Sequence, residues 1–174
     1  PLASLDAPRK AEILPFIERL RDRFQVPIVY VSHAMDEIVR LADTLVLMSD
    51  GAIAAVGPVE DLTSRLDLRP LTGRYEAGSV IAATVAGHDA EFGLTRLAFA
   101  GGTLVVPRLD APAGQEIRVR IRARDVSLAL NRPAGLSIQN VLPGTVMEIG
   151  AQVEASVSDL DIRVDIGVPL WVRV

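Results

Sequence analysis

The pattern of hydrophobic and polar positions changes character between the two halves of the chain. In the first half, apolar residues recur at helical spacing in two stretches, Ile13–Phe24 and Met35–Ala42, and short apolar runs lie at Ile28–Val31 and Thr44–Met48. The helical spacing predicts amphipathic helices, and the short runs predict buried strands. Helices that alternate with strands predict an α/β arrangement for this half.

Cap and turn residues mark the boundaries of these elements. Asp6 can cap the first helix, with Pro8 in its first turn. Pro15 lies inside the apolar stripe of that helix, so we expect a kink or a short break there. Asp50-Gly51 predicts a hairpin whose return strand runs from Ala52 to Val56. The stripe of the first helix consists of Ile13, Ile17, Leu20 and Phe24.

The second half consists of short alternating stretches. From Leu68 to Ser79 the periodicity is interrupted by Pro70, Gly73 and Gly78, which indicates a linker. Beyond it, closely spaced strand patterns separated by turn residues predict a small β-barrel or sandwich. These predicted strands are Val80–Ala86, Leu94–Phe99, Thr103–Pro107, Glu116–Ala123, Val126–Leu130, Thr145–Ile149, Val153–Val157, Ile162–Ile166 and Leu170–Val174.

Composition and charge exclude several classes of function. The net charge is −4 and aromatic residues make up 4% of the chain, so binding of nucleic acid through phosphates or stacked bases is disfavoured. No uncharged apolar run approaches the roughly 20 residues that a membrane helix needs, and no signal peptide opens the chain. With no cysteine, we expect no disulfide and no thiolate metal site.

Several polar residues are candidates for chemistry. Ser32-His33 falls where a strand should end and a helix begin, a place where ligands and anions bind in α/β sheets. A lone histidine at such a position is more often structural. Four arginines from Arg118 to Arg124 share one strand face, which favours a solvated or salt-bridged surface over an anion site. We interpret His88 and Trp171 as structural.

The segment Ile28–Gly51 resembles the switch-histidine region of ATP-binding-cassette (ABC) ATPases, in which Ser-His is followed by a helix that opens with an acidic pair, here Asp36-Glu37. The first six residues resemble the D-loop of the same family, and its distance from His33 along the chain also fits. This resemblance implies that His33 is catalytic: it contacts the γ-phosphate of ATP and helps to position the attacking water. It also implies that the D-loop contacts a second copy across a head-to-tail dimer, through Ser4, Leu5 and Asp6.

Other parts of an ABC ATPase are not found in this sequence. A phosphate loop needs Gly-x-x-x-x-Gly-Lys, but the single lysine, Lys10, follows Ala7-Pro8-Arg9. The Leu-Ser-Gly-Gly-Gln signature is absent, and the catalytic glutamate is expected immediately before Pro1. We therefore expect ATP and magnesium to serve the intact subunit, and this chain alone to lack ATPase activity and cofactors.

The second half resembles the accessory TOBE/Mop domain of importer ATPases, an OB-like barrel. Ile121–Leu128 matches its Arg-x-x-Asp-Val segment, and Leu136–Val146 resembles the opening of the molybdate-binding module. Gln139 stands where that module has arginine, and Pro143 where it often has lysine, so two charge-assisted donors are missing. The resemblance implies an oxyanion site at Ser137, Gln139 and Asn140.

Together these features predict an α/β remnant of an ABC ATPase domain at 1–67, a linker at 68–78 and an all-β OB-like barrel at 79–174 that continues beyond the chain. The predicted function is that of the ATP-hydrolysing subunit of a molybdate importer, at the cytoplasmic face of the bacterial inner membrane without insertion into it. Its expected partners are a second copy and a membrane permease, with molybdate as a ligand of the barrel. The alternatives are a non-catalytic dimerisation or binding module, and an importer ATPase for sulfate or another anion.

Overall fold

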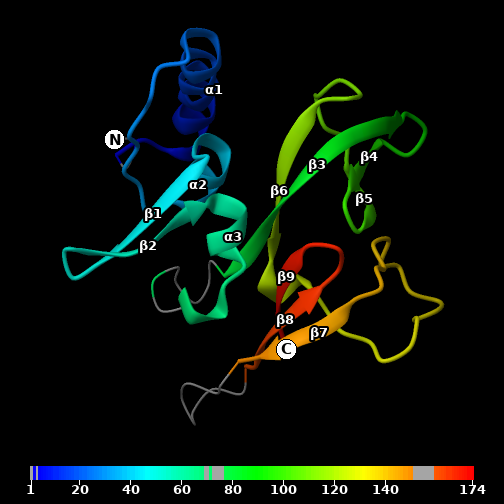
Figure 1. Cartoon of the computed structure of the whole chain (residues 1–174). Helices are drawn as coiled ribbons and strands as arrows, with labels where there is room; N and C mark the ends of the chain where they lie inside the picture. The colour runs from blue at the N-terminus through cyan, green and yellow to red at the C-terminus, as the bar shows by residue number, and fades with distance from the viewer. Residues whose placement is uncertain (1, 3, 69–70, 72–76, 151–158) are drawn as a thin grey trace. The chain divides into compact units, whose positions relative to one another are not determined.

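The computed structural model describes residues 2, 4–68, 71, 77–150 and 159–174. The chain forms two compact units, unit 1 (Pro1–Val59) and unit 2 (Glu60–Val174). Unit 1 contains two helices and a hairpin, and unit 2 contains two antiparallel sheets (Figure 1). Most of the predicted linker lies outside the described residues, so the division at 68–78 stays a prediction.

Helix α1 (Ala7–Phe24) begins where the cap residue predicts. The Asp6 side chain accepts a hydrogen bond from Arg9 N at 3.0 Å, and a proline occupies the first turn. Helix α1 runs through Pro15 as one helix of 18 residues, so the short break that was one of the two expectations is absent, and a kink there stays a prediction.

The apolar stripe of α1 is only partly buried in this chain. Leu14 packs with Leu2 and Leu41, and Ile17 lies against this cluster. The remaining stripe residues face solvent: Ile13 is 36% exposed, Leu20 48% and Phe24 66%. The predicted stripe is therefore correct only at Ile17, and the buried residue of the helix, Leu14, was not part of it.

The predicted strand Ile28–Val31 is wrong. Residues 25–34 connect α1 to α2 (Met35–Leu41) without forming a strand, and Val29 is 94% exposed. The β-branched run favours an extended backbone, but a strand also needs a hydrogen-bonded neighbour. Among the described residues no other segment pairs with this one.

The predicted hairpin is confirmed. Strands β1 (Thr44–Ser49) and β2 (Ala52–Pro58) pair antiparallel, with Ser49 opposite Ala52. Asp50 and Gly51 have φ of 50° and 77°, the left-handed pair that a two-residue type I′ turn requires.

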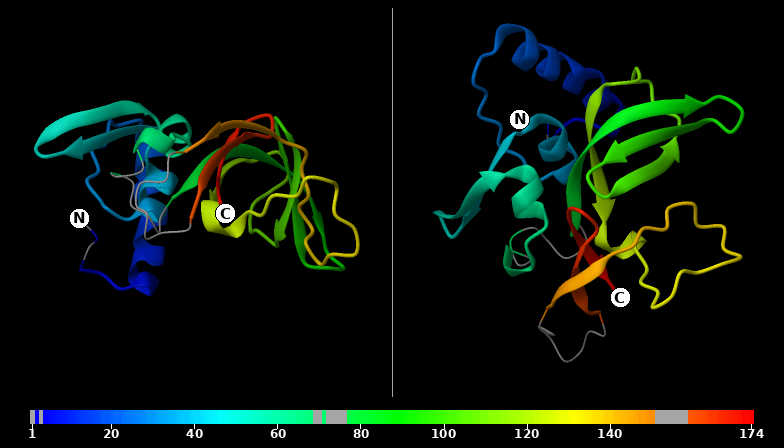
Figure 2. Two further views of the ribbon diagram at one scale, coloured as in Figure 1. Left: turned by 90° about the horizontal axis from the view of Figure 1, so that it is seen from below. Right: turned by 45° about the vertical axis from the view of Figure 1, so that its right-hand side comes forward.

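Unit 2 contains seven described strands in two sheets. The first sheet has the order β5-β4-β3-β6 and the second β7-β8-β9 (Figures 1 and 2). Two short helical elements precede the sheets and one follows β6. The elements are α3 (Val59–Thr63), η1 (Leu66–Leu68), β3 (Gly78–Asp89), β4 (Leu94–Phe99), β5 (Gly102–Pro107), β6 (Glu116–Arg122), η2 (Ala123–Asp125), β7 (Thr145–Ile149), β8 (Asp161–Asp165) and β9 (Pro169–Arg173). The helices and hairpin of unit 1 and the two sheets of unit 2 confirm a small α/β part followed by a barrel-like β domain.

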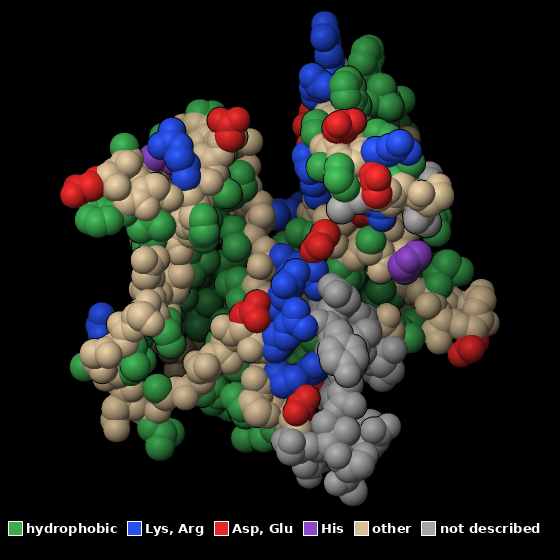
Figure 3. All heavy atoms as spheres, turned by 180° about the vertical axis from the view of Figure 1, so that it is seen from behind, with side chains coloured by type: hydrophobic (Ala, Val, Ile, Leu, Met, Phe, Trp, Pro, Cys, Tyr) green, Lys and Arg blue, Asp and Glu red, His purple; other side chains and the backbone are tan. Residues whose placement is uncertain are grey.

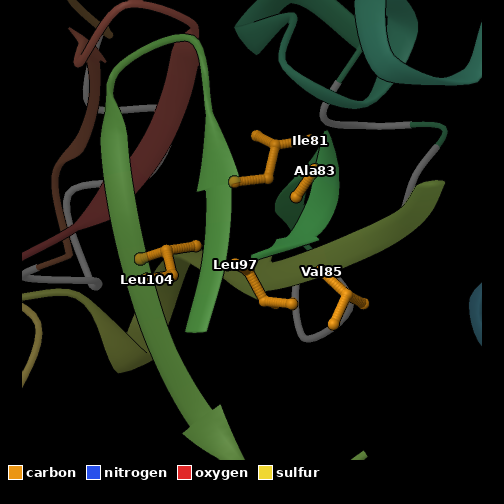
Figure 4. Close-up of a cluster of buried hydrophobic side chains, with 5 residues drawn as sticks. All are labelled: Ile81, Ala83, Val85, Leu97 and Leu104. Carbon is orange, nitrogen blue, oxygen red and sulfur yellow. The ribbon is translucent and has the colours of Figure 1, made fainter. Parts of the chain in front are cut away.

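The core of unit 2 joins the two sheets. Figure 4 shows side chains from β3, β4 and β5 converging, among them Ile81, Leu97 and Leu104. Phe99 and Leu142 pack against this cluster and also against the buried side chains of β8 and β9. One continuous apolar interior therefore supports the sheets.

Two predicted strands of unit 2 have a different outcome. Val126–Leu130 is not a strand, and Leu130 is fully exposed in a long loop that runs to β7. As at Ile28–Val31, an apolar pattern without a pairing neighbour does not make a strand. Val153–Val157 lies outside the described residues.

Candidate functional site

The three residues predicted to contact a second copy lie in the turn before α1. Leu5 donates its amide to the Leu2 carbonyl at 3.0 Å and packs against the core of unit 1. Asp6 caps α1, and its carboxylate is exposed, as is Ser4. The turn is therefore held by the backbone and the cap, while the polar groups of Ser4 and Asp6 face outward.

His33 lies in the turn that leads into α2, and its side chain is exposed. Ser32 Oγ accepts a hydrogen bond from Ala34 N at 3.1 Å, so one hydroxyl bridges the residues on either side of the histidine. Ala34 is the N-cap residue of α2 and has no side-chain acceptor to offer. The Ser32 hydroxyl supplies the side-chain acceptor there.

Glu37 is the residue of this site that sequence reasoning missed. It is 4% exposed, and its Oε2 accepts hydrogen bonds from Tyr30 OH at 2.8 Å and from Ser32 Oγ at 2.7 Å. Its Oε1 forms an ion pair with Lys10 Nζ at 2.8 Å. The available signal was the i, i+4 spacing of Glu37 and Leu41, which puts the carboxylate on the buried face of α2. A buried carboxylate needs partners of this kind.

These contacts shift two pKa values in opposite directions. The hydrogen bonds from Lys10 and Ser32 lower the pKa of Glu37 to about 2, against the opposing effect of burial, and Tyr30 adds to the lowering. Burial, together with the hydrogen bond to Glu37, raises the pKa of Tyr30 to about 12. The ionised carboxylate and the neutral phenol are thus the stable forms across the neutral range.

Two further contacts fix α2 against α1. Arg40 forms a bidentate ion pair with Glu18, whose longer arm joins Nη2 and Oε2 at 2.9 Å. Arg21 Nη1 donates to the Leu41 carbonyl at 2.9 Å and so satisfies a carbonyl at the end of α2. The hydrogen bond to Glu18 raises the pKa of Arg40.

In unit 2, the predicted oxyanion residues line one side of a cavity of about 1130 Å³ bounded by β5, β6, β8, β9 and the loop after η2. Figure 3 shows this hollow with hydrophobic side chains inside it. Asn140 Oδ1 accepts from Val105 N at 2.7 Å, and Nδ2 donates to Val105 O at 2.8 Å. Asn140 therefore joins the loop to β5 as a strand residue would. Ser137 and Gln139 are exposed at the cavity.

The remaining candidates have structural partners. His88 Nδ1 lies 2.9 Å from Thr95 Oγ1, and Nε2 lies 2.9 Å from the Ala111 carbonyl. Arg118 forms an ion pair with Glu60 at 2.7 Å, which confirms the salt-bridged interpretation for that arginine. Trp171 is fully buried.

Comparison with known proteins adds the family. No protein-family model matches the chain. It is 59% identical over 149 residues to the molybdenum import ATP-binding protein ModC of Paramagnetospirillum magneticum, an alignment that covers 86% of this chain and 41% of that protein. The proteins of the same name from Rhodospirillum rubrum and Yersinia pseudotuberculosis are 50% and 46% identical over the whole chain and 48% of their own length. The chain spans about half the length of the curated relatives it matches.

The chain has a Ser-His turn before a helix and a barrel-like β unit after it. Together with these relatives, this places it in the class of ATP-binding subunits of ABC importers. Within this class the chain belongs to the family of molybdenum import ATP-binding proteins, whose C-terminal part it matches. Among the described residues, no helix is long and apolar enough to span a membrane.

Proposed function

We propose that this chain is part of the ATP-hydrolysing subunit of a molybdate importer. The observation that carries the proposal is the identity of 46–59% to proteins named for molybdenum import and ATP binding. The subunit would work at the cytoplasmic face of the inner membrane, bound to a permease. Binding of ATP would close a dimer of two copies, and hydrolysis would reopen it.

In this proposal His33 contacts the γ-phosphate of ATP, and Ser4, Leu5 and Asp6 approach the nucleotide site of the second copy. The exposed imidazole on a turn held by Ser32 supports this role. The described residues contain no group of three His, Cys, Asp or Glu side chains that could hold a metal ion. Their contribution is to position and stabilise charge.

The test is ATP hydrolysis by the subunit that contains this chain, reconstituted with its permease. We expect His33→Ala to reduce hydrolysis about 100-fold, because a positioned contact to the transferred phosphoryl group is lost. His88→Gln is the matched control and should retain hydrolysis, because the other histidine lies in unit 2 with structural partners. Hydrolysis at the wild-type rate by His33→Ala would contradict the assigned role.

We further propose that the barrel binds molybdate and thereby senses its concentration. The exposed side chains of Ser137 and Gln139 beside the cavity support this idea. Asn140 Nδ2 donates one of its two N–H groups to Val105, so its second N–H is the one that would contribute to this site. Titration calorimetry with molybdate, and with sulfate for comparison, should show saturable binding that Ser137→Ala weakens. Absence of binding would leave the barrel as a dimerisation element, and a preference for sulfate would change the cargo.

A further inference from the structure

Glu37 connects three segments of unit 1 that are distant along the chain. Its carboxylate pairs with Lys10 on α1 at 2.8 Å and accepts hydrogen bonds from Tyr30 and Ser32 in the segment before α2. At 4% exposure, little water competes for these contacts. Charge-assisted hydrogen bonds in such a site are stronger than neutral ones.

The Ser32 hydroxyl extends this contact to His33. It donates to Glu37 Oε2 at 2.7 Å and accepts from Ala34 N at 3.1 Å. Ser32 and Ala34, on either side of His33, are therefore both connected by hydrogen bonds of the Ser32 hydroxyl to the buried Glu37 carboxylate. The imidazole itself is exposed, so a fixed backbone presents a side chain that is open to a ligand.

Lys10 extends the connection in the other direction. Its amide donates to the Asp6 carbonyl at 3.0 Å within the first turn of α1, and its ammonium group pairs with Glu37. The turn that carries Ser4 and Asp6 is thus linked, through one helical turn and one ion pair, to the turn that carries His33.

We propose that Glu37 is a positioning residue that fixes the His33 turn and couples it, through Lys10, to the Ser4–Asp6 turn. The structural part of this inference stands on the contacts of unit 1, and its consequence for ATP hydrolysis rests on the proposed function. The ionised carboxylate is needed because it accepts from three donors at once. Glutamine offers one acceptor oxygen, and its amide group is itself a donor that would face another donor.

The chain contains a matched control for this proposal. Glu18 also lies on α1 and forms an ion pair with Arg40 of α2, so it joins the same two helices. The ion pair of Glu18 is with Arg40 of α2 and does not involve residues 30–34. Glu18→Gln therefore removes an ion pair between helices without touching the histidine turn, whereas Glu37→Gln removes both the ion pair and the support of Ser32.

The first test is nuclear magnetic resonance on the chain itself, which contains two histidines. We expect Glu37→Gln to shift or broaden the ring signals of His33 and to speed amide exchange at Ala34, while the His88 signals in unit 2 stay unchanged. Glu18→Gln should leave both histidines unchanged. Unaltered His33 signals in folded Glu37→Gln would overturn the inference, whatever the function of the protein.

The second test measures steady-state ATP hydrolysis by the subunit that contains this chain. We expect Glu37→Gln to lower kcat about tenfold or more with little change in KM, because a displaced contact near the reacting group affects the chemical step. Lys10→Arg should keep most of the activity since it keeps the ion pair, and Glu18→Gln should keep all of it. An inactive His33→Ala beside a fully active Glu37→Gln would overturn the inference and leave the proposed function intact. A wild-type subunit without hydrolysis would overturn the proposed function, and the magnetic resonance result would still decide the positioning role.

Discussion

Replacement of Glu37 by glutamine removes one charge from a buried site while it keeps the size of the side chain. The hydrogen bonds from Lys10, Ser32 and Tyr30 lower the pKa of this carboxyl from 4.5 to about 2. A difference of one between the folded and unfolded pKa corresponds to about 1.4 kcal/mol. The lowered pKa of Glu37 therefore corresponds to a contribution of about 3 kcal/mol to the free energy of unfolding of unit 1. The side chain is 4% exposed, so solvent screens this contribution little.

The sign of the pH dependence follows from the lowered pKa. A carboxyl whose folded pKa lies below its unfolded value stabilises fully above about pH 5, and this stabilisation is lost as the pH falls toward about 2. The wild type should therefore exceed Glu37→Gln by about 3 kcal/mol near neutral pH, and the difference should shrink to a few tenths of a kcal/mol at about pH 2.

Urea unfolding of the two proteins across this pH range measures the difference. Far-ultraviolet circular dichroism follows unit 1, because its helices of 18 and 7 residues dominate the helical signal. Fluorescence of the single tryptophan, Trp171, follows unit 2 separately. The other carboxylates are common to both proteins, so their effects cancel. A stability difference that does not change with pH would refute the reasoning.

Three further predictions concern Tyr30, Asn140 and Asp6. Burial and the hydrogen bond to Glu37 raise the pKa of Tyr30 to about 12, so an ultraviolet titration should show one phenol that ionises near that pH. This transition should be absent in Tyr30→Phe, and its pKa should be lower in Glu37→Gln. Ionisation of the Tyr30 phenol at the ordinary pKa would contradict this. Asn140→Ala removes two hydrogen bonds to Val105 and should lower the free energy of unfolding of unit 2, measured in urea, by about 1–2 kcal/mol. Ser137→Ala should leave it unchanged. Equal stabilities of Asn140→Ala and the wild type would show that these two hydrogen bonds do not stabilise the loop. Asp6→Ala removes the cap of α1 and should cost about 1 kcal/mol by circular dichroism, and Asp6→Asn should restore most of it; no loss in Asp6→Ala would mean that the cap is not stabilising.

Elements that are determined by residues close together in the sequence could be predicted from it. The strands Leu94–Phe99 and Thr145–Ile149 have the predicted bounds, and Asp50-Gly51 forms the predicted turn. In each case the alternation, or the need for positive φ, is contained within a few residues. The N-cap role of Asp6 is local in the same sense.

Features that depend on distant partners could not be predicted in this way. Ile28–Val31 and Val126–Leu130 have strand-like side chains, but pairing is decided by another segment. The sequence identified Glu37 only as an acidic residue of a predicted helix. Its burial and its contacts with Tyr30 and Lys10 arise because the fold brings these residues together. His33 lies before a helix as predicted, but no strand precedes it, and the contact of the buried Glu37 carboxylate with Ser32 was not predicted.

Uptake of radiolabelled molybdate into proteoliposomes tests the central claim most directly. The vesicles would contain the subunit that includes this chain together with its permease, with ATP on the side of the subunit. We expect accumulation of molybdate that requires ATP, exceeds that of sulfate, and is lost in His33→Ala but retained in Glu18→Gln. Accumulation that is independent of ATP, or equal in the wild type and His33→Ala, would contradict it.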